Sequence, residues 1–262
     1  MLEKLLRPLL GRKSLCWFYW RLYKLALLGM NVGMGGDVKA SGEDNVLLRV
    51  RDRASGTHPV TIFDVGANKG QYSANILRVL NGIETEIHCF EPGHETFREL
   101  SSSLGGREKV TLNNFGLSSK KSEGRLWYDK TGSGLASLYK RQLEQFGIDF
   151  EQSEAVKLDT LDSYIDGKNI AAIDLLKIDV EGSELDVLHG AGKALADGRI
   201  KAIQIEFGGC NIDSRTFIRD FWNLLHERFR MYRIMKDGLA EIRKYDERLE
   251  IFTCTNFYFE LR

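Results

Sequence analysis

The chain has no excess of either charge and few of the residues that build metal sites or disulfide frameworks. Its 37 Lys and Arg residues balance its 37 Asp and Glu residues, so the formal net charge is zero. A neutral chain has no field that draws in a polyanion, and nucleic acid is therefore not favoured as a partner. The four cysteines are scattered, which predicts free, buried thiols in a reducing compartment and gives no reason to assign a metal site. They are Cys16, Cys89, Cys210 and Cys254.

The sequence also lacks a long apolar run, an internal repeat and a low-complexity tract. Residues 1–30 are basic and apolar, but they contain no small-residue cleavage site, so we expect no cleavable signal peptide. Arg21 and Lys24 interrupt this segment, and about 20 apolar residues are needed to span a bilayer. The total length of 262 residues allows one α/β domain with a sizeable core plus a small extension.

The N-terminal segment leaves two interpretations open. The aromatic cluster Trp17-Phe18-Tyr19-Trp20 is flanked by Arg and Lys, which is typical of a helix that lies in a membrane interface. The alternative is a helix that packs on the domain or on a second subunit. A hinge is expected at Gly33–Gly36. The sequence therefore predicts a helical, basic-aromatic extension over residues 1–36 and a main domain over residues 37–262.

From residue 60 onward, short β-rich runs alternate with amphipathic helical patterns. Alternation of this kind predicts a parallel sheet covered by helices on both faces, as in Rossmann-like α/β folds. Two strands at 231–235 and 251–259 have no long helix between them, which predicts an antiparallel pair at the sheet edge. The other expected strands are 60–65, 86–90, 110–113, 175–179 and 200–205, and the expected helices are 70–80, 94–104, 183–188 and 216–229.

A long insertion, residues 120–157, separates the third and fourth parallel strands. Its middle, residues 128–137, is polar and rich in glycine. Long loops in compact domains are often lids or substrate-contacting elements. A plain β-hairpin around residues 126–128 with a solvated tip is the alternative, and both interpretations stay open.

The most informative stretch is a strand that ends near Asp64 and turns through Gly66-x-Asn68-x-Gly70 into a helix. A nicotinamide site more often shows Gly-x-Gly-x-x-Gly, which places a pyrophosphate on the helix N-terminus. An acid just before the turn disfavours pyrophosphate and suits a cationic ligand with an amino group. S-adenosylmethionine fits, because it carries a sulfonium, an α-amino group and a ribose diol. We expect Asp64 to face its amino-acid end, directly or through a water. The glycines and Asn68 would allow the backbone to approach it.

The next strand ends in Glu91-Pro92, where a ribose-binding carboxylate is expected. Charge-assisted hydrogen bonds from the diol would each contribute about 1.5–3 kcal/mol net. The alternative is that Glu91 only caps the helix that begins after Pro92. Asn114, after the third strand, is a candidate on the adenine side. Tyr72, Ser73 and Pro92 complete the expected cofactor-binding set.

Further carboxylates follow the fourth and fifth expected strands. Asp179 and Glu181 are alternate residues and share one face if the strand continues, and Glu206 ends the next strand. Like charges buried together are costly unless a cation or a proton intervenes, and the ligand sulfonium, Lys177 or a divalent ion are candidates. The alternatives are Lys177 as a surface ion-pair partner and Glu184 as a helix-start acid. We take Glu181, then Asp179, then Glu206 as candidate general bases, and Asp179 also as a cofactor contact.

Four blocks of the sequence together resemble the FkbM family of methyltransferases. They are Phe63–Gly70, Phe90–Pro92, Thr160–Asp162 and Lys177–Glu184. The resemblance covers roughly Ser41 to the C-terminus. It implies a class I methyltransferase fold, a seven-stranded sheet with an antiparallel last strand, and S-adenosylmethionine as methyl donor. It also implies a hydroxyl oxygen as the usual acceptor, on surface-polysaccharide sugars, nodulation-type glycolipids or macrolide natural products.

These features predict an O-methyltransferase for a sugar, glycoconjugate or natural product, in a bacterial-type cytoplasm or docked at the inner membrane surface. A homo-oligomer is compatible with the sequence. Orienting the reactants supplies about 7–11 kcal/mol, whereas a general base adds 10²–10⁴-fold, roughly 3–5 kcal/mol. Positioning is thus the larger contribution. Two other classes stay open, a nicotinamide-dependent oxidoreductase and a non-catalytic, membrane-associated scaffold of the same fold.

Overall fold

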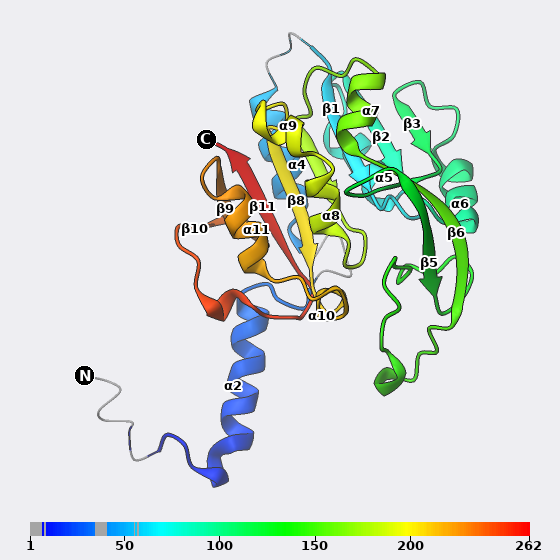
Figure 1. Cartoon of the computed structure of the whole chain (residues 1–262). Coiled ribbons are helices and arrows are strands. Elements are labelled where there is room, and N and C mark those ends of the chain that lie inside the picture. Colours follow the sequence, from blue (N-terminus) through cyan, green and yellow to red (C-terminus); the bar gives the residue numbers. More distant parts are fainter. Residues whose placement is uncertain (1–6, 8, 35–40, 55, 57) are drawn as a thin grey trace.

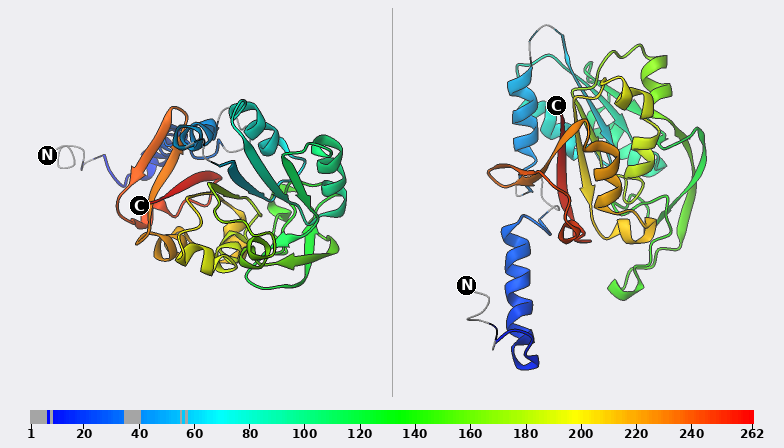
Figure 2. Two further views of the ribbon diagram at one scale, coloured as in Figure 1. Left: turned by 90° about the horizontal axis from the view of Figure 1, so that it is seen from above. Right: turned by 60° about the vertical axis from the view of Figure 1, so that its left-hand side comes forward.

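The molecule is built around one large mixed sheet with helices on both faces (Figures 1 and 2). The structure, a computed structural model, describes residues 7, 9–34, 41–54, 56 and 58–262. The strands of this sheet are β1 (Val60–Val65), β2 (Thr85–Phe90), β3 (Val110–Asn113), β7 (Leu175–Ile178), β8 (Ala202–Phe207), β9 (Phe229–Met235), β10 (Gly238–Ile242) and β11 (Thr255–Leu261).

The strand order in the main sheet is β10-β9-β11-β8-β7-β1-β2-β3. The strands from β3 to β8 pair in parallel, whereas β11 runs antiparallel to both of its neighbours, β8 and β9. This arrangement confirms the expected mostly parallel sheet with an antiparallel last strand. The expected antiparallel pair is present as β9 and β11. The eighth strand, β10, was not predicted; it pairs antiparallel with β9 and forms the edge of the sheet.

Two layers of helices bury the two faces of the sheet. The helices that contribute to one apolar cluster are α4 (Asp44–Arg53), α5 (Gln71–Val79) and α6 (His94–Leu104). Those that contribute to the other are α7 (Leu161–Gly167), α8 (Glu184–His189), α9 (Gly192–Ala196) and α11 (Ile218–Leu225). The central strands are mostly apolar and buried because they are covered on both sides, as parallel strands usually are. All six residues of β1 are buried.

The insertion forms a small second sheet beside the main one. It consists of β4 (Gly116–Leu117), β5 (Ser122–Tyr128) and β6 (Gln152–Asp159), in the order β4-β6-β5. β5 and β6 pair antiparallel over seven residues, which confirms the expected hairpin. The loop between them, residues 129–151, is not a plain solvated tip, because Ser137 pairs back with Trp127 and Ser137 is fully buried.

The N-terminal segment projects from the domain as a single helix, α2 (Cys16–Gly29), preceded by a short 3₁₀ turn, η1 (Lys13–Leu15) (Figures 1 and 2). No residue of α2 is buried, so the helix does not pack on the domain as one interpretation expected. Its C-terminal end is held by the side-chain amide of Asn31, which donates to the backbone oxygens of Ser41 and Ile234. No helix within the described residues is long and apolar enough to cross a bilayer. Gly35 and Gly36 of the expected hinge, and the boundary after residue 36, lie outside the described residues.

All four cysteines are free thiols. Cys89 and Cys210 are buried and Cys254 is half-buried, close to the prediction. Cys16 is exposed, because it begins the projecting helix α2. The prediction of buried thiols was therefore wrong for Cys16.

Candidate functional site

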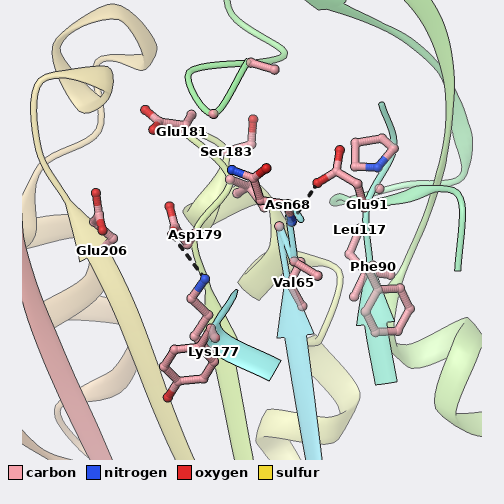
Figure 3. A pocket seen from close by; sticks show the side chains of 18 of the residues that line it. Val65, Asn68, Phe90, Glu91, Leu117, Lys177, Asp179, Glu181, Ser183 and Glu206 are labelled. Carbon is pink, nitrogen blue, oxygen red and sulfur yellow. Dashed lines mark hydrogen bonds and ion pairs between the residues drawn. The ribbon is translucent and has the colours of Figure 1, made fainter. Parts of the chain in front are cut away.

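A cavity of about 650 Å³ opens at the carboxyl ends of the parallel strands. Ligands of open α/β sheets usually bind in this crevice. The turn after β1 forms the middle of its wall, Glu91 at the tip of β2 stands on one side, and the acids that follow β7 and end β8 stand on the other (Figure 3). The site therefore has two distinct halves, one on each side of Asn68.

The turn after β1 can only be built with glycine at its first position. Gly66 has a φ of +79°, and an added Cβ would lie 1.8 Å from the backbone oxygen of Asp179. Asn68 also adopts a left-handed conformation, with a φ of +49°, which asparagine tolerates better than most residues. Gly70, with a φ of +88°, begins α5 and packs against Leu104. The turn thus brings the end of β1 into contact with the start of the acidic turn after β7.

Glu91 is buried, with 7% of its surface exposed, and both carboxylate oxygens accept backbone N–H groups. Oε2 accepts from Asn68 at 3.0 Å and Oε1 from Gly93 at 2.9 Å. Burial raises the pKa of Glu91 to about 7, against the lowering effect of these two hydrogen bonds. The bond to Gly93, the residue before α6, agrees in part with the alternative that Glu91 caps that helix. The carboxylate nevertheless lines the cavity, where each oxygen keeps a second lone pair for a ligand hydroxyl.

Asp64 lies behind the cavity wall and does not line it. Its side chain is fully buried on the α5 face of β1, where Oδ2 accepts a hydrogen bond from Ser73 Oγ at 2.7 Å. Oδ1 lies 3.5 Å from Lys177 Nζ. We expected Asp64 to face the ligand's amino-acid end, directly or through a water. The structure directs its side chain at α5 and not into the cavity, and its part in cofactor binding stays a prediction. Its charge acts on the cavity through Lys177, which does line it.

Lys177 is the cation at the centre of the acidic half. Its Nζ lies 3.1 Å from Asp179 Oδ2 and 5.1 Å from the centre of the Tyr72 ring. Burial lowers the pKa of Lys177, but Asp179, Asp64 and Glu43 raise it by more, so the lysine stays charged. The alternative of a surface ion-pair partner was wrong, because Lys177 is only 6% exposed. Its place inside the apolar run of β7 was the available signal, since a lysine there must enter the interior.

Glu181 occupies a strained turn that the buried carboxylate of Glu184 holds in place. The strand ends at Ile178, and Glu181 adopts a left-handed backbone with a φ of +53°. Glu184 Oε1 accepts the N–H groups of Val180, at 3.2 Å, and Gly182, at 2.9 Å. Glu184 does begin α8, as predicted, but it is buried and fixes this turn. A non-glycine residue in this conformation costs on the order of 1–3 kcal/mol and is typical of functional sites.

The insertion loop reaches over the acidic half and contacts the same turn. Ser137 Oγ donates to the backbone oxygen of Glu181 at 2.6 Å, and Arg141 Nη1 lies 2.6 Å from Glu181 Oε2. Burial raises the pKa of Glu181 to about 7, Asp179 adds to the rise, and Arg141 opposes it. Burial likewise raises the pKa of Glu206 well above its usual range, although Cys254 Sγ donates to its Oε1 at 3.1 Å. Glu181 is therefore an acid whose pKa lies near neutral pH, and it is paired with the buried cation Arg141.

The structure brings most of the predicted site residues to one cavity. Gly66, Asn68, Tyr72, Glu91, Pro92, Asp179, Glu181 and Glu206 line it. The remaining predicted residues, Asp64, Gly70, Ser73 and Asn114, lie behind its wall. Asn114 holds the tip of β2, because its side-chain amide donates to the backbone oxygens of Glu91 and Pro92. The roles assigned to these residues stay predictions.

Sequence reasoning missed three charged residues of the site, of which Arg78 of α5 lines the cavity. Glu43 lies just before α4, is 5% exposed, and accepts a hydrogen bond from Gln204 Nε2 at 2.6 Å. Arg141 lies in the insertion loop. Arg141 follows neither a strand nor a glycine turn, so no local pattern marks it, and Glu43 follows a glycine turn that lies before the first strand of the sheet. Within the described residues, no group of three or more His, Cys, Asp and Glu side chains is arranged to hold a metal ion.

The wall fits an adenosyl and amino-acid ligand in two respects. Asn68 Oδ1 and Ser183 Oγ are buried, line the cavity and have no hydrogen-bond partner, which leaves an acceptor and a hydroxyl for a ligand. The backbone N–H groups of Gly66 and Asn68 donate to Phe90 and Glu91 within the protein, so the turn does not offer them to a pyrophosphate. Glu91 and Asp179 surround it with negative charge, which favours a cationic ligand and disfavours a phosphate.

The chain is similar to a known protein family and to several known proteins. The model of the methyltransferase FkbM domain matches residues 64–234. A hexuronic acid methyltransferase of Haloferax volcanii is 24% identical over 64% of this chain and 64% of its own length. The 2-O-methyltransferase NoeI of Sinorhizobium fredii is 24% identical over 53% of this chain and 60% of its own. The chain thus spans less than two thirds of these relatives. A solved FkbM methyltransferase of Methylobacillus flagellatus covers 78% of this chain and 45% of that one, with 18% identity and a TM-score of 0.46.

Proposed function

We propose that this chain, which belongs to the FkbM methyltransferase family and uses S-adenosylmethionine, methylates a hydroxyl oxygen of a sugar or glycoconjugate. Membership of the family sets aside the nicotinamide-dependent oxidoreductase. The fold is the class I methyltransferase fold. The observation that carries the proposal is the two-sided cavity, with Glu91 on one side of Asn68 and Glu181 with its neighbouring acids on the other.

The Glu91 side is assigned to the ribose. A carboxylate whose two oxygens are fixed by backbone N–H groups presents its remaining lone pairs in a set direction, which suits two adjacent hydroxyls. Asn68 Oδ1 and Ser183 Oγ would bond polar groups of the same ligand. Asn114 and Ser73 act behind this wall as positioning residues, because one holds the tip of β2 and the other bonds Asp64.

The acidic side is assigned to the reaction. When bound, S-adenosylmethionine supplies an electrophilic methyl group on a sulfonium. Glu181 would accept the proton of the attacking hydroxyl, because a base with a pKa of about 7 is half ionised at neutral pH. Arg141 fixes the carboxylate, and Ser137 fixes its backbone. Asp179 and Glu206 would surround the cationic centre and orient it, with Lys177 limiting their mutual repulsion.

The acceptor is assigned from the site and the relatives together. Two of the relatives are named as a hexuronic acid methyltransferase and a 2-O-methyltransferase. A cavity that mixes carboxylates with Arg78, Lys177 and apolar residues such as Leu126 and Leu138 suits a polyhydroxylated ring more than a flat aromatic one. A base with a raised pKa is also what a weakly acidic sugar hydroxyl needs.

Two measurements test the proposal. Calorimetry with S-adenosylhomocysteine should show saturable binding that Glu91→Ala weakens by at least tenfold, because the carboxylate's charged hydrogen bonds are each worth about 1.5–3 kcal/mol. Glu86→Ala, an exposed acid on the same strand, is the matched control and should bind as wild type does. Equal affinity in both variants would refute the ribose assignment.

Acceptors are then screened with labelled methyl donor, using sugar nucleotides, free glycans and lipid-linked sugars. The proposal predicts label on a hydroxyl oxygen, and Glu181→Gln should lower kcat by 10²–10⁴-fold with little change in cofactor affinity. A chain that binds the cofactor but modifies no hydroxyl in any of these classes would instead support the non-catalytic scaffold.

A further inference from the structure

The apolar side chains on the surface of this protein are concentrated on the N-terminal segment. Eleven of the fifteen large apolar side chains that are exposed in the described part of the chain lie between Leu9 and Met34. Trp17 is 60% exposed, Trp20 59% and Leu25 65%. Contiguous exposure of this kind marks an interaction surface rather than ordinary surface variation.

The same segment carries only positive charge. Residues 7–34 contain no Asp or Glu. Arg21 lies over the ring of Trp17 at 5.2 Å, and Lys24 lies near that of Trp20 at 6.0 Å. The other basic residues of the segment are Arg7, Arg12 and Lys13. In a chain whose net charge is zero, this is a strong local asymmetry.

Exposed apolar side chains lie on all sides of α2, and its two basic residues lie among them. Phe18, Leu22 and Leu25 are spaced four and three residues apart, so they share one side of the helix. Arg21 and Lys24, three residues apart, share an adjoining side. Fourteen residues at about 1.5 Å each give roughly 21 Å, too short for a 30 Å hydrocarbon core. The helix therefore suits the plane of an interface.

The root of α2 lies beside the cavity. The backbone N–H of Gly33 donates to the oxygen of Cys254 at 2.7 Å, and the thiol of Cys254 in turn donates to Glu206, which lines the cavity. Figure 1 shows α2 leaving the domain from the end of the sheet toward which β8 points, the end at which the cavity opens. α10 (Cys210–Ser214), at the same end, exposes Ile212.

We propose that residues 9–34 dock this protein on an anionic lipid surface, with the mouth of the cavity on the side that faces the membrane. The side of α2 that carries Leu22 enters the headgroup boundary while Arg21 and Lys24 pair with lipid phosphates. A second copy of this chain is a less favourable partner for α2, because pairing the two helices would bring together two positively charged segments that contain no Asp or Glu. The docking itself does not depend on the identity of the acceptor.

Flotation of the full chain with vesicles tests this. Wild type should float with phosphatidylcholine vesicles that contain anionic phosphatidylglycerol and float weakly with phosphatidylcholine alone. Arg21→Gln with Lys24→Gln should lower partitioning to anionic vesicles by about 25-fold, since each basic residue contributes roughly a factor of five. Phe18→Ser with Leu25→Ser should lower it on both kinds of vesicle.

Two variants serve as matched controls. Lys120→Gln with Lys121→Gln removes two exposed charges just before β5, at the end of that strand that lies away from α2. Leu224→Ser removes an exposed apolar side chain of α11. Both should float as wild type does. Binding of S-adenosylhomocysteine, measured by calorimetry, should be equal in all variants, which separates this inference from the proposed reaction.

Either of two results would overturn the inference. Wild type that stays unbound on anionic vesicles excludes docking. A dimer in light scattering that Phe18→Ser with Leu25→Ser dissociates, together with no flotation, would show that a second copy covers α2.

Discussion

Gly66 is the residue on which the geometry of the site depends most directly. The backbone of β1 passes so close to the acidic turn after β7 that a single added carbon would meet the carbonyl of Asp179. Neither chain segment can retreat easily, because Asp179 N–H donates to the oxygen of Val65 at 2.9 Å. The contact therefore couples the ribose side of the cavity to the acidic side.

Gly66→Ala should destabilise the fold and abolish cofactor binding. Gly82→Ala is the matched control, because Gly82 has a similar φ of +86° but open space where its Cβ would lie. The left-handed backbone costs both variants roughly 1–2 kcal/mol, and we expect Gly66→Ala to lose at least about 2 kcal/mol more. Urea denaturation measures both. Equal losses would show that the close approach to Asp179 is not rigid.

Cofactor affinity should depend on pH through Glu91. With a pKa of about 7, this carboxylate is mostly protonated at pH 6 and mostly ionised at pH 8, and only the ionised form accepts both ribose hydroxyls well. Affinity for S-adenosylhomocysteine should therefore fall about tenfold from pH 8 to pH 6. Calorimetry across this range should show that Glu91→Gln loses the dependence and Glu181→Gln keeps it. The reverse pattern would assign the titration to Glu181.

The sequence predicted the kinds of residue at the site better than their directions. Gly66, Glu91 and Glu181 follow from the rule that parallel strands meet ligands at their carboxyl ends, because the turn residues stand out in sequence. The direction of the Asp64 side chain, toward α5, could not be predicted, since alternation along a strand does not say which face points at the ligand when both faces are buried. Arg141 was missed because a long loop carries no periodic signal.

The insertion makes contacts with Glu181 that its sequence did not predict. β5 and β6 form a hairpin, and their connecting loop returns to line the cavity through Ser133, Gly134 and Ala136. Its role as a lid or substrate contact stays a prediction. Its contacts with Glu181 place a basic residue against the candidate base. The loop should therefore influence the ionisation of the site as well as its shape.

Arg141→Gln should shift the pH dependence of turnover. Arg141 lowers the pKa of Glu181, so its removal raises that pKa above about 7, and the base ionises only at higher pH. The acidic limb of the kcat profile should move upward by about one pH unit or more, given roughly 1.5–3 kcal/mol for a charged hydrogen bond. Lys140→Gln is the control, because Lys140 pairs with Glu151 instead. An unchanged profile would exclude Glu181 as the base.

Strands and helices with strong patterns were predicted closely, and weak ones were not. The bounds of β1, β3 and α6 match the sequence prediction, because apolar runs and helical periodicity are clear there. β10 was missed because it is a short strand of mixed polar and apolar residues. It lies at the edge of the sheet, where its residues are partly or fully exposed. The exposure of α2 was left open, because an apolar helix has the same sequence whether it meets a domain, a second copy or a lipid.

Ligand binding should stabilise the whole domain, since one cavity touches four strands of the central sheet. At a hundredfold excess over its dissociation constant, S-adenosylhomocysteine adds about 2.7 kcal/mol to the free energy of unfolding. For a domain of this size that raises Tm by roughly 5–10 °C. Differential scanning fluorimetry measures the shift, and Glu91→Ala should reduce it. A wild-type Tm that does not respond to ligand would mean that the cavity is not the binding site.

The place of β11 has a consequence for how the protein is made. β11 lies between β8 and β9, so the hairpin of β9 and β10 cannot join the sheet until residues 255–261 have left the ribosome. Until then the nascent chain presents the open backbone edge of β8, a strand whose four apolar residues are all buried in the finished molecule. During translation this aggregation-prone intermediate therefore stays exposed while about fifty further residues are added. We expect chaperones to bind it during that interval.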